Sequence, residues 1–306
     1  MIDRFHGAIP AMVTPFDTDY RLDEDRVREL IDGYLAAGVH GISVAGSQGE
    51  FFMLSKEERL RLIKVTVETV DQRVPVYAGT GTVTTAETIE LTQAAESLGA
   101  DIALLITPYF IQPNDDELFE HYRSVSAATK LPLLLYNNPP RTSVNISVPL
   151  FARCAALDNI VGIKDSSGDL TQFAEYMRIT GGEKLGFSGR DTLTLTMMMH
   201  GCNGAISPAA NVFPEMVVKQ YELAREGQWE ASREVHDILA PLRVAWALGS
   251  FPVVIKESMS IVGRDAGPTR PPIAALTPDA RAKLTAVLDE IRTKIQGYSE
   301  QIAQTS

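Results

Sequence analysis

The stretch Asn159-Ile-Val-Gly-Ile-Lys-Asp-Ser-Ser-Gly168 is the segment from which the fold is predicted. Its apolar part, 160–163, is short and rich in β-branched residues, and a polar turn with glycine follows it. This combination predicts a strand that is buried on both faces, as in a parallel sheet covered by helices. Lys164 closes the strand. A lysine there either reaches water, or is a desolvated amine that serves as a Schiff-base nucleophile on a ketone or keto acid.

Similar short apolar runs recur along the chain and alternate with amphipathic stretches. We predict strands at 7–13, 41–45, 74–78, 101–106, 131–135, 160–164, 184–188 and 204–207. Helices are predicted at 23–37, 55–70, 84–98, 114–129, 148–157, 169–180, in a methionine-rich segment that ends at His200, and at 214–225. Because strand–helix alternation implies a parallel sheet, and eight such units close a barrel, the sequence predicts an α/β fold, the (β/α)₈ TIM barrel.

The pattern changes after Gly227. The segments 229–246, 253–262 and 278–296 look helical, and no strand is predicted between them. We therefore expect two regions: a barrel over residues 1–226, and a C-terminal helical extension over residues 227–306 that packs on the barrel.

Composition excludes several classes of protein. The chain has 306 residues, of which 45% are hydrophobic and 22% charged, so a sizeable core can form. Its formal net charge of −11 argues against nucleic acid as a partner, because phosphate binding needs clustered Lys and Arg. A small anionic substrate remains compatible, since one local arginine can bind it.

The chain shows no sign of secretion or of membrane insertion. Its N-terminal sequence lacks the basic and apolar regions of a signal peptide, and no apolar run reaches membrane-spanning length. Cys154 and Cys202 are its only cysteines, which favours a reducing cytoplasm over a disulfide-bonded extracellular fold.

Barrel enzymes place their functional residues at the C-terminal ends of the strands. In this chain those ends carry Ser47, Gln48, Tyr109, Phe110, Tyr136, Arg141, Lys164 and Gly189. The set contains an amine, phenols, a hydroxyl and a guanidinium, but no carboxylate pair of the glycosidase kind. No metal site is predicted either, because no two of the five histidines have ligand spacing: His6, His40, His121, His200 and His236.

Two glycine turns and one tyrosine were each weighed between a structural and a functional interpretation. The turn Gly46-Ser-Gln-Gly49 is either an anion nest built from backbone N–H groups or a plain strand–helix loop. The turn Gly79-Thr-Gly81 lacks the third glycine of a dinucleotide fingerprint and is interpreted as a tight turn. Tyr136 is either structural or, since its strand adjoins that of Lys164, part of one pocket in which phenol and amine pass the protons of carbinolamine chemistry.

Taken together, these segments resemble the dihydrodipicolinate synthase and N-acetylneuraminate lyase family of class I pyruvate-dependent aldolases. The similarity covers essentially the whole chain. The segments that carry it are Gly46-Ser-Gln-Gly-Glu50, Gly79-Thr-Gly81, Thr107-Pro-Tyr109, Tyr136-Asn-Asn-Pro-Pro-Arg141 and Gly162-Ile-Lys-Asp-Ser-Ser-Gly168.

The resemblance implies a role for each matching residue. Lys164 would form the Schiff base with pyruvate or a 2-keto acid, Tyr136 would be the general acid and base, and Ser47 would relay protons to it. The backbone amides of Ser47 and Gln48 would hold the pyruvate carboxylate. Arg141 would bind a substrate carboxylate, as in the synthases, and Gly189 and Ile206 would line the pocket. The resemblance also implies a homo-oligomer, a dimer or tetramer, that needs no cofactor.

Two positions depart from the family pattern. Gln48 stands where the family has a second hydroxyl residue, and Phe110 stands where many members have a tyrosine that enters the neighbouring subunit's site. Phenylalanine cannot exchange a proton, which leaves Tyr109 as the candidate substitute phenol.

Three functions are therefore compatible with the sequence. Arg141 favours a dihydrodipicolinate synthase-like enzyme that acts on pyruvate and an aldehyde. Gln48 and Phe110 favour an aldolase or dehydratase of a 2-keto-3-deoxy sugar acid. The third function is that of a non-catalytic barrel that binds a keto acid as a sensor.

Overall fold

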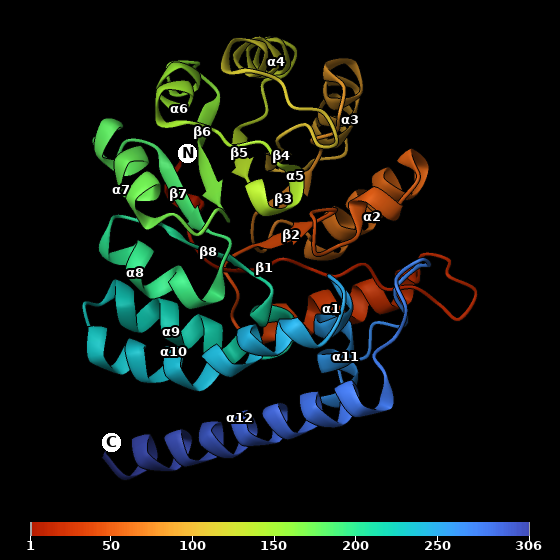
Figure 1. Ribbon diagram of the computed structural model, residues 1–306, viewed down its shortest axis with the longest axis vertical. Helices are drawn as coiled ribbons and strands as arrows, with labels where there is room; N and C mark the ends of the chain where they lie inside the picture. Colours follow the sequence, from red (N-terminus) through yellow and green to blue (C-terminus); the bar gives the residue numbers. More distant parts are fainter. Residues whose placement is uncertain (1, 306) are drawn as a thin grey trace.

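The computed structural model describes residues 2–305 and contains eight parallel strands ringed by helices (Figure 1). The strands are β1 (Gly7–Pro10), β2 (Ile42–Val44), β3 (Val76–Gly79), β4 (Ile102–Ile106), β5 (Leu133–Asn137), β6 (Ile160–Asp165), β7 (Leu185–Ser188) and β8 (Gly204–Ser207). Met1 and Ser306, the outer ends of the two expected regions, lie outside the described residues.

The strands pair in chain order around the ring. The sheet runs β1-β8-β7-β6-β5-β4-β3-β2, and all of its paired strands are parallel. The ring is completed by a single parallel bridge between Ala11 and Ser43, next to β1 and β2. The predicted (β/α)₈ barrel is confirmed.

Helices follow the strands and cover the outside of the ring (Figure 1). They are α1 (Glu24–Ala36), α2 (Lys56–Val70), α3 (Thr85–Ser97), α4 (Asp115–Ala127), the short α5 (Pro139–Thr142), α6 (Val148–Ala155), α7 (Leu170–Ile179), α8 (Thr194–Met199) and α9 (Pro214–Arg225). Short 3₁₀ turns lie at η1 (Ile2–Arg4), η2 (Phe51–Met53), η3 (Asp191–Leu193) and η4 (Ala209–Asn211).

Alternation along each strand separates an inner core from an outer one. On β5, Leu134 and Tyr136 belong to the cluster inside the barrel, whereas Leu133 and Leu135 belong to the cluster between the strands and the helices. Successive side chains of a strand point to opposite faces, so both faces of this strand are buried. The alternation directs Tyr136 into the barrel.

The C-terminal segment adds three helices, α10 (Trp229–Val244), α11 (Val253–Ile261) and α12 (Pro278–Thr305), and the 3₁₀ turn η5 (Ala245–Leu248). Figure 1 shows α12 on the outside, alongside α10 and α11. Leu284, Leu288 and Ile291 of α12 share one buried cluster with Ala8 of β1 and Val27 of α1. The extension therefore packs on the barrel, while its predicted boundary at residue 226 stays a prediction.

Several predicted boundaries were wrong, and the structure gives a physical reason for two of them. The last helix continues past Gln296 to Thr305, because Gly297 does not stop it and Tyr298 packs against the buried cluster. The first strand ends at Pro10 rather than Val13. The main chain beyond Pro10 donates alternately to Ser207 and Ser43, which belong to different neighbours, so regular pairing with one strand stops.

No helix among residues 2–305 is both long enough and apolar enough to span a membrane.

Candidate active site

Six of the predicted residues line one cavity at the C-terminal end of the barrel. They are Ser47, Gln48, Tyr136, Arg141, Lys164 and Gly189, and the cavity has a volume of about 80 Å³. They come from the segments that follow β2, β5 and β7 and from strands β5 and β6 themselves. The sequence rule that barrel sites gather at these strand ends therefore located the cavity.

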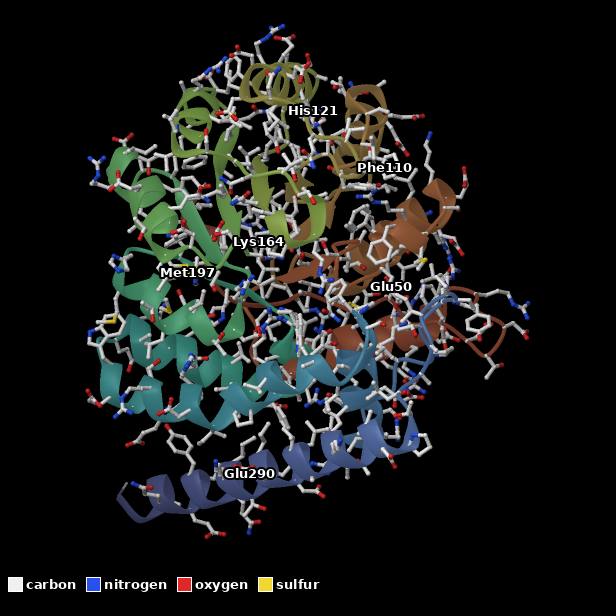
Figure 2. All side chains as sticks on the ribbon, viewed as in Figure 1. Glu50, Phe110, His121, Lys164, Met197 and Glu290 are labelled. Atoms are coloured by element: carbon white, nitrogen blue, oxygen red, sulfur yellow. The ribbon has the colours of Figure 1, made fainter. Side chains whose placement is uncertain are left out.

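Lys164 and Tyr136 are neighbours because their strands are in register. Tyr136 of β5 pairs with Lys164 of β6, and the lysine Nζ lies 4.1 Å from the centre of the tyrosine ring. Lys164 is only 5% exposed, and among the described residues its Nζ makes no hydrogen bond or ion pair. Figure 2 shows it near the middle of the molecule. The side chain thus faces the cavity rather than bulk water.

The phenol of Tyr136 lies in a polar environment that favours its ionised form. Burial alone raises the pKa of Tyr136, but the Lys164 ammonium and the polar groups of Ser166, Ser47 and Asn138 lower it, and the net pKa lies below the usual 10. Asn138 Nδ2 donates to the phenol oxygen at 2.8 Å. The two serine hydroxyls lie near the phenol without completing a hydrogen bond in the described structure. A lowered pKa increases, near neutral pH, the fraction of the phenolate, which is the form that accepts a proton.

Four buried polar atoms of residues that line the cavity have no partner within the described structure. They are Ser47 Oγ, Gln48 Oε1, Ser166 Oγ and Trp246 Nε1. The Gln48 amide is oriented by its Nε2, which donates to the Pro252 carbonyl at 3.4 Å. Because buried polar atoms in proteins are almost always satisfied, this group of atoms indicates a binding site for a polar ligand.

Gly189 packs closely against Ser166 and the stem of Lys164. A Cβ atom placed there would lie 1.9 Å from Ser166 Oγ and 3.0 Å from Lys164 Cε. Any side chain would therefore displace Ser166 and press on the lysine stem.

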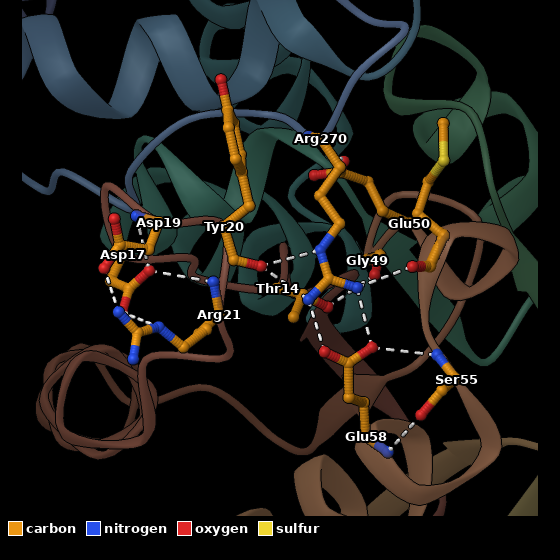
Figure 3. A network of polar contacts seen from close by, with 11 residues as sticks. Thr14, Asp17, Asp19, Tyr20, Arg21, Gly49, Glu50, Ser55, Glu58 and Arg270 are labelled. Carbon is orange, nitrogen blue, oxygen red and sulfur yellow. Dashed lines mark hydrogen bonds and ion pairs between the residues drawn. The ribbon is translucent and has the colours of Figure 1, made fainter.

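The turn that carries Ser47 and Gln48 is held by its last residue, Glu50, which is fully buried. The Glu50 carboxylate lies 2.8 Å from Lys256 Nζ of α11 and accepts from the main-chain N–H of Arg270 at 3.2 Å. Burial first of all lowers the pKa of Lys256 to about 8, against the opposing effect of Glu50. The Arg270 guanidinium also pairs with Glu58 of α2 (Figure 3). The C-terminal segment thus fixes the position of a turn at the barrel mouth.

The other glycine turn is structural. The Arg59 guanidinium donates to the carbonyls of Gly79 and Gly81 at 2.9 and 3.1 Å. A Cβ atom at Gly79 would lie 2.1 Å from the Ala45 carbonyl oxygen, so the turn packs directly against the chain after β2. These contacts agree with the interpretation of Gly79-Thr-Gly81 as a tight turn.

Three of the predicted site residues lie away from the cavity of their own chain. Ile206 of β8 is fully buried inside the barrel and is not among the lining residues. Tyr109 packs edge-to-face against Phe51 with ring centres 5.6 Å apart, and burial raises its pKa. Phe110 is 97% exposed, and Figure 2 shows it far from Lys164. Within one chain, neither Tyr109 nor Phe110 is among the residues that line the cavity.

Several lining residues were not predicted from the sequence. They are Asn138, Ser166, Arg190, Arg243, Trp246 and Phe251, among others. Arg190 follows Gly189 just beyond the end of β7, so the strand-end rule could have found it. Arg243, Trp246 and Phe251 belong to the C-terminal extension, and no local pattern in their sequence indicates that they return to the barrel mouth.

His6 and His40 lie next to each other, with ring centres 5.3 Å apart, and both rings lie against Tyr221. His121 Nδ1 bonds Thr85 Oγ1 at 3.0 Å, and His6 Nδ1 bonds Tyr221 Oη at 3.1 Å. Over residues 2–305, no group of three or more His, Cys, Asp or Glu side chains is placed to hold a metal ion.

Comparison with known proteins identifies the family. The model described as the dihydrodipicolinate synthetase family matches residues 4–291. A 4-hydroxy-tetrahydrodipicolinate synthase of Methanothrix thermoacetophila is 40% identical over 94% of this chain and 97% of its own. One of Citrifermentans bemidjiense is 41% identical over 94% and 99%. The solved structure of the 4-hydroxy-tetrahydrodipicolinate synthase from Methylacidiphilum fumariolicum SolV superposes with a TM-score of 0.93, at 34% identity, over 97% of this chain and 99% of that chain. The chain belongs to the dihydrodipicolinate synthetase family.

Proposed function

We propose that this protein is an enzyme that joins pyruvate to an aldehyde, or cleaves the 2-keto acid they form, through a Schiff base on Lys164. The observation that carries the proposal is a buried amine 4.1 Å from the ring of Tyr136, in a cavity bordered by polar atoms without partners. The names of the relatives support a reaction of the 4-hydroxy-tetrahydrodipicolinate synthase kind.

The first stage is formation of the iminium. The Lys164 amine attacks the C2 carbonyl of pyruvate, and the carbinolamine then loses water. Both steps need a group that gives a proton and takes it back. Tyr136 is the proposed group, because its pKa is lowered and Asn138 holds its oxygen. The Ser47 hydroxyl, which has no hydrogen-bond partner in the described structure, is the proposed relay to the phenol.

The second stage is carbon–carbon bond formation. The iminium draws electrons from C3, so loss of a C3 proton gives an enamine, and the enamine attacks the aldehyde carbon. Hydrolysis of the new iminium then releases the product and restores the amine.

Two groups are proposed to bind carboxylates. The backbone amides of Ser47 and Gln48 would hold the carboxylate of pyruvate, on a turn that the Glu50–Lys256 ion pair fixes in place. Arg141 is proposed to bind a carboxylate of the second substrate by charge-assisted hydrogen bonds.

A second candidate is an aldolase or dehydratase of a 2-keto-3-deoxy sugar acid. Gln48 Oε1 favours it, because a buried acceptor without a partner suits a hydroxyl donor of the kind that sugar acids carry. The third candidate, a non-catalytic barrel that binds a keto acid, would have no use for an amine and a phenol of lowered pKa in contact.

We also propose a homo-oligomer in a reducing compartment. Phe110 is 97% exposed and Ile111 beside it is 45% exposed, which forms an apolar loop tip suited to contact with another copy. The thiols of Cys154 and Cys202 are both free and buried, as expected where disulfides do not form. Sedimentation of wild type against Phe110→Asp tests the oligomer: the variant should dissociate, and an unchanged mass would contradict this part.

The test of function is a screen in both directions. One arm offers pyruvate with aspartate semialdehyde. The other offers 2-keto-3-deoxy acids and sialic acid, with release of pyruvate as the signal. Turnover in the first arm supports a synthase, and turnover confined to the second supports the sugar-acid candidate. Binding of pyruvate with no turnover of any substrate would leave only the non-catalytic barrel.

A further inference from the structure

Two of the four unpartnered polar atoms at the cavity have no part in the proposed proton relay. Ser47 Oγ and Ser166 Oγ lie beside the Tyr136 phenol, and a serine hydroxyl can both donate and accept. The other two atoms are Gln48 Oε1 and Trp246 Nε1, and both residues line the cavity. An amide oxygen can only accept and an indole N–H can only donate, so each of these two atoms requires a partner of the opposite kind.

The Gln48 side chain presents its oxygen, not its nitrogen, to a ligand. Gln48 is only 4% exposed, and its Nε2 donates to the Pro252 carbonyl at 3.4 Å. The reversed amide would place Oε1 against that carbonyl oxygen, and two acceptors without a hydrogen between them repel each other. The orientation that leaves Oε1 without a partner is therefore the favoured one. The Glu50–Lys256 ion pair holds the turn that carries it.

The Trp246 indole is fixed by two neighbours that also line the cavity. Arg243 Cζ lies 3.8 Å from the centre of the ring, and the Phe251 ring is tilted against it with centres 5.9 Å apart. The guanidinium contacts the face of the indole, which leaves the N–H group at the ring edge available. Buried indole N–H groups usually find a partner, so this one marks a place for an acceptor.

Gln48 and Trp246 meet at one segment of the C-terminal extension. Gln48 donates to the carbonyl of Pro252, and Trp246 packs against Phe251, the residue before it. The acceptor and the donor therefore lie on the same side of the cavity, although their residues are far apart in the sequence. The cavity has a volume of about 80 Å³ and is also lined by Lys164. A group that meets both atoms is consequently close to the reacting carbons.

Only one common substituent of an aldehyde satisfies both atoms. A carboxylate accepts from Trp246 but offers Gln48 no hydrogen, whereas an ammonium group donates to Gln48 but cannot accept from Trp246. An alkyl group leaves both atoms buried without a partner, which is costly. A hydroxyl group donates to Gln48 Oε1 and accepts from Trp246 Nε1 at the same time.

We propose that Gln48 and Trp246 hold one hydroxyl group of the second substrate between them, and that this substrate is a 2-hydroxyaldehyde. The hydroxyl is assigned to the carbon next to the aldehyde because the two atoms share a small cavity with the lysine. The inference rests on the proposed Schiff-base reaction and concerns only the residues that select the aldehyde. A site built to bond a hydroxyl rejects the analogue that lacks it, because its own polar atoms are then left unpaired.

The experiment compares three small aldehydes with wild type and pyruvate. Glycolaldehyde carries the hydroxyl, propanal replaces it by a methyl group of similar size, and methoxyacetaldehyde keeps the electron-withdrawing oxygen but has no hydrogen to donate. We expect kcat/KM for glycolaldehyde to exceed that for each of the other two on the order of 10- to 100-fold. A wild-type value for propanal or methoxyacetaldehyde that equals or exceeds that for glycolaldehyde would overturn the inference, whether or not any variant folds.

Variants separate recognition of the hydroxyl from packing. Gln48→Met and Trp246→Phe each remove one of the two polar atoms and keep much of the side-chain volume. Each should lower the ratio of kcat/KM for glycolaldehyde to that for propanal about tenfold. A purely structural role would lower both values equally and leave the ratio unchanged, so an unchanged ratio in both variants would also overturn the inference.

The chain offers a matched control for each variant. Gln93 of α3 also donates through Nε2 to a main-chain carbonyl, that of Ala128 at 2.8 Å. Trp229 is the other tryptophan of the chain and begins α10. Neither residue lines the cavity, so Gln93→Met and Trp229→Phe should keep the wild-type ratio.

Failure of the underlying reaction is seen separately. Borohydride trapping of wild type with pyruvate, without any aldehyde, tests the Schiff base alone. Trapping together with turnover of aspartate semialdehyde, but of no hydroxyaldehyde, overturns only this inference. Absence of trapping overturns the proposed function and this inference with it.

Discussion

At the scale of single residues, Gly189 shows how closely the cavity is packed. A methyl group there would meet Ser166 Oγ at 1.9 Å and Lys164 Cε at 3.0 Å. We expect Gly189→Ala to lower kcat/KM on the order of 100-fold, because displacement of a reacting group by about 1 Å costs that much. Gly297→Ala is the control, since a Cβ atom there meets nothing within 4 Å. Full activity in Gly189→Ala would show that the lysine stem does not need this space.

Tyr136 is the second residue whose removal is informative. Tyr136→Phe keeps the ring against Lys164 and removes the oxygen that Asn138 contacts. Steady-state kinetics should show kcat lower by on the order of 10²–10⁴, the usual contribution of a positioned acid or base. Tyr122→Phe removes another buried phenol, one that has no partner among the described residues and lies on α4. Equal losses in both variants would point to a packing effect instead of proton transfer.

At the scale of elements, the ion pair between Glu50 and Lys256 joins the turn after β2 to α11. Both residues are almost fully buried, so Lys256→Met would leave an uncompensated carboxylate in the interior. We expect urea unfolding to show a free energy of unfolding lower by about 3–5 kcal/mol.

The double variant Glu50→Gln with Lys256→Met is the matched control for this ion pair. It removes both charges and should regain much of the loss. If the single variant is as stable as wild type, the turn does not depend on this pair.

Secondary structure was predictable where its signal is local. Along 133–137, alternate residues enter the inner and outer clusters, and this burial on both faces produces the continuous apolar run that marks the strand in the sequence. The end of α12 was not predictable, because Gly297 indicates a stop while the packing of Tyr298 lies outside any local pattern.

The site residues also divide into those with a local signal in the sequence and those without one. Ser47, Tyr136 and Lys164 could be assigned to one cavity because each stands at or just beyond a strand end and parallel strands end together. Arg243 and Trp246 could not, since they reach the cavity from α10 and η5 only through the packing of the extension.

At the scale of the whole molecule, stability should depend on pH through a buried histidine. Burial lowers the pKa of His121 from 6.5 to about 4, so the folded state keeps this side chain neutral while the unfolded state binds a proton below about pH 6.5. Its contribution is therefore complete above pH 6.5 and is lost as the pH falls towards 4. Between pH 7 and pH 5 the free energy of unfolding should decrease by about 2 kcal/mol on account of His121.

The measurement is urea unfolding across this pH range in wild type and in His121→Gln. In His121→Gln, the part of the decrease in the free energy of unfolding that is due to His121 should be absent, whatever the stability of the variant at pH 7. Identical slopes in the two proteins would mean that His121 takes up its proton equally well in the folded state.

The most direct test of the account is borohydride reduction of the enzyme with pyruvate, followed by peptide mass mapping. We predict one reduced pyruvyl group per chain, on Lys164, and none in Lys164→Ala. Lys256 and Lys184 are the competing amines, because burial lowers the pKa of each, to about 8 for Lys256. Their ammonium groups already donate to the carbonyls of Pro268 and Ile160, respectively, at 2.7 Å, so neither should react. Labelling at either of these lysines, or no labelling at all, would contradict the central claim that Lys164 is the Schiff-base nucleophile.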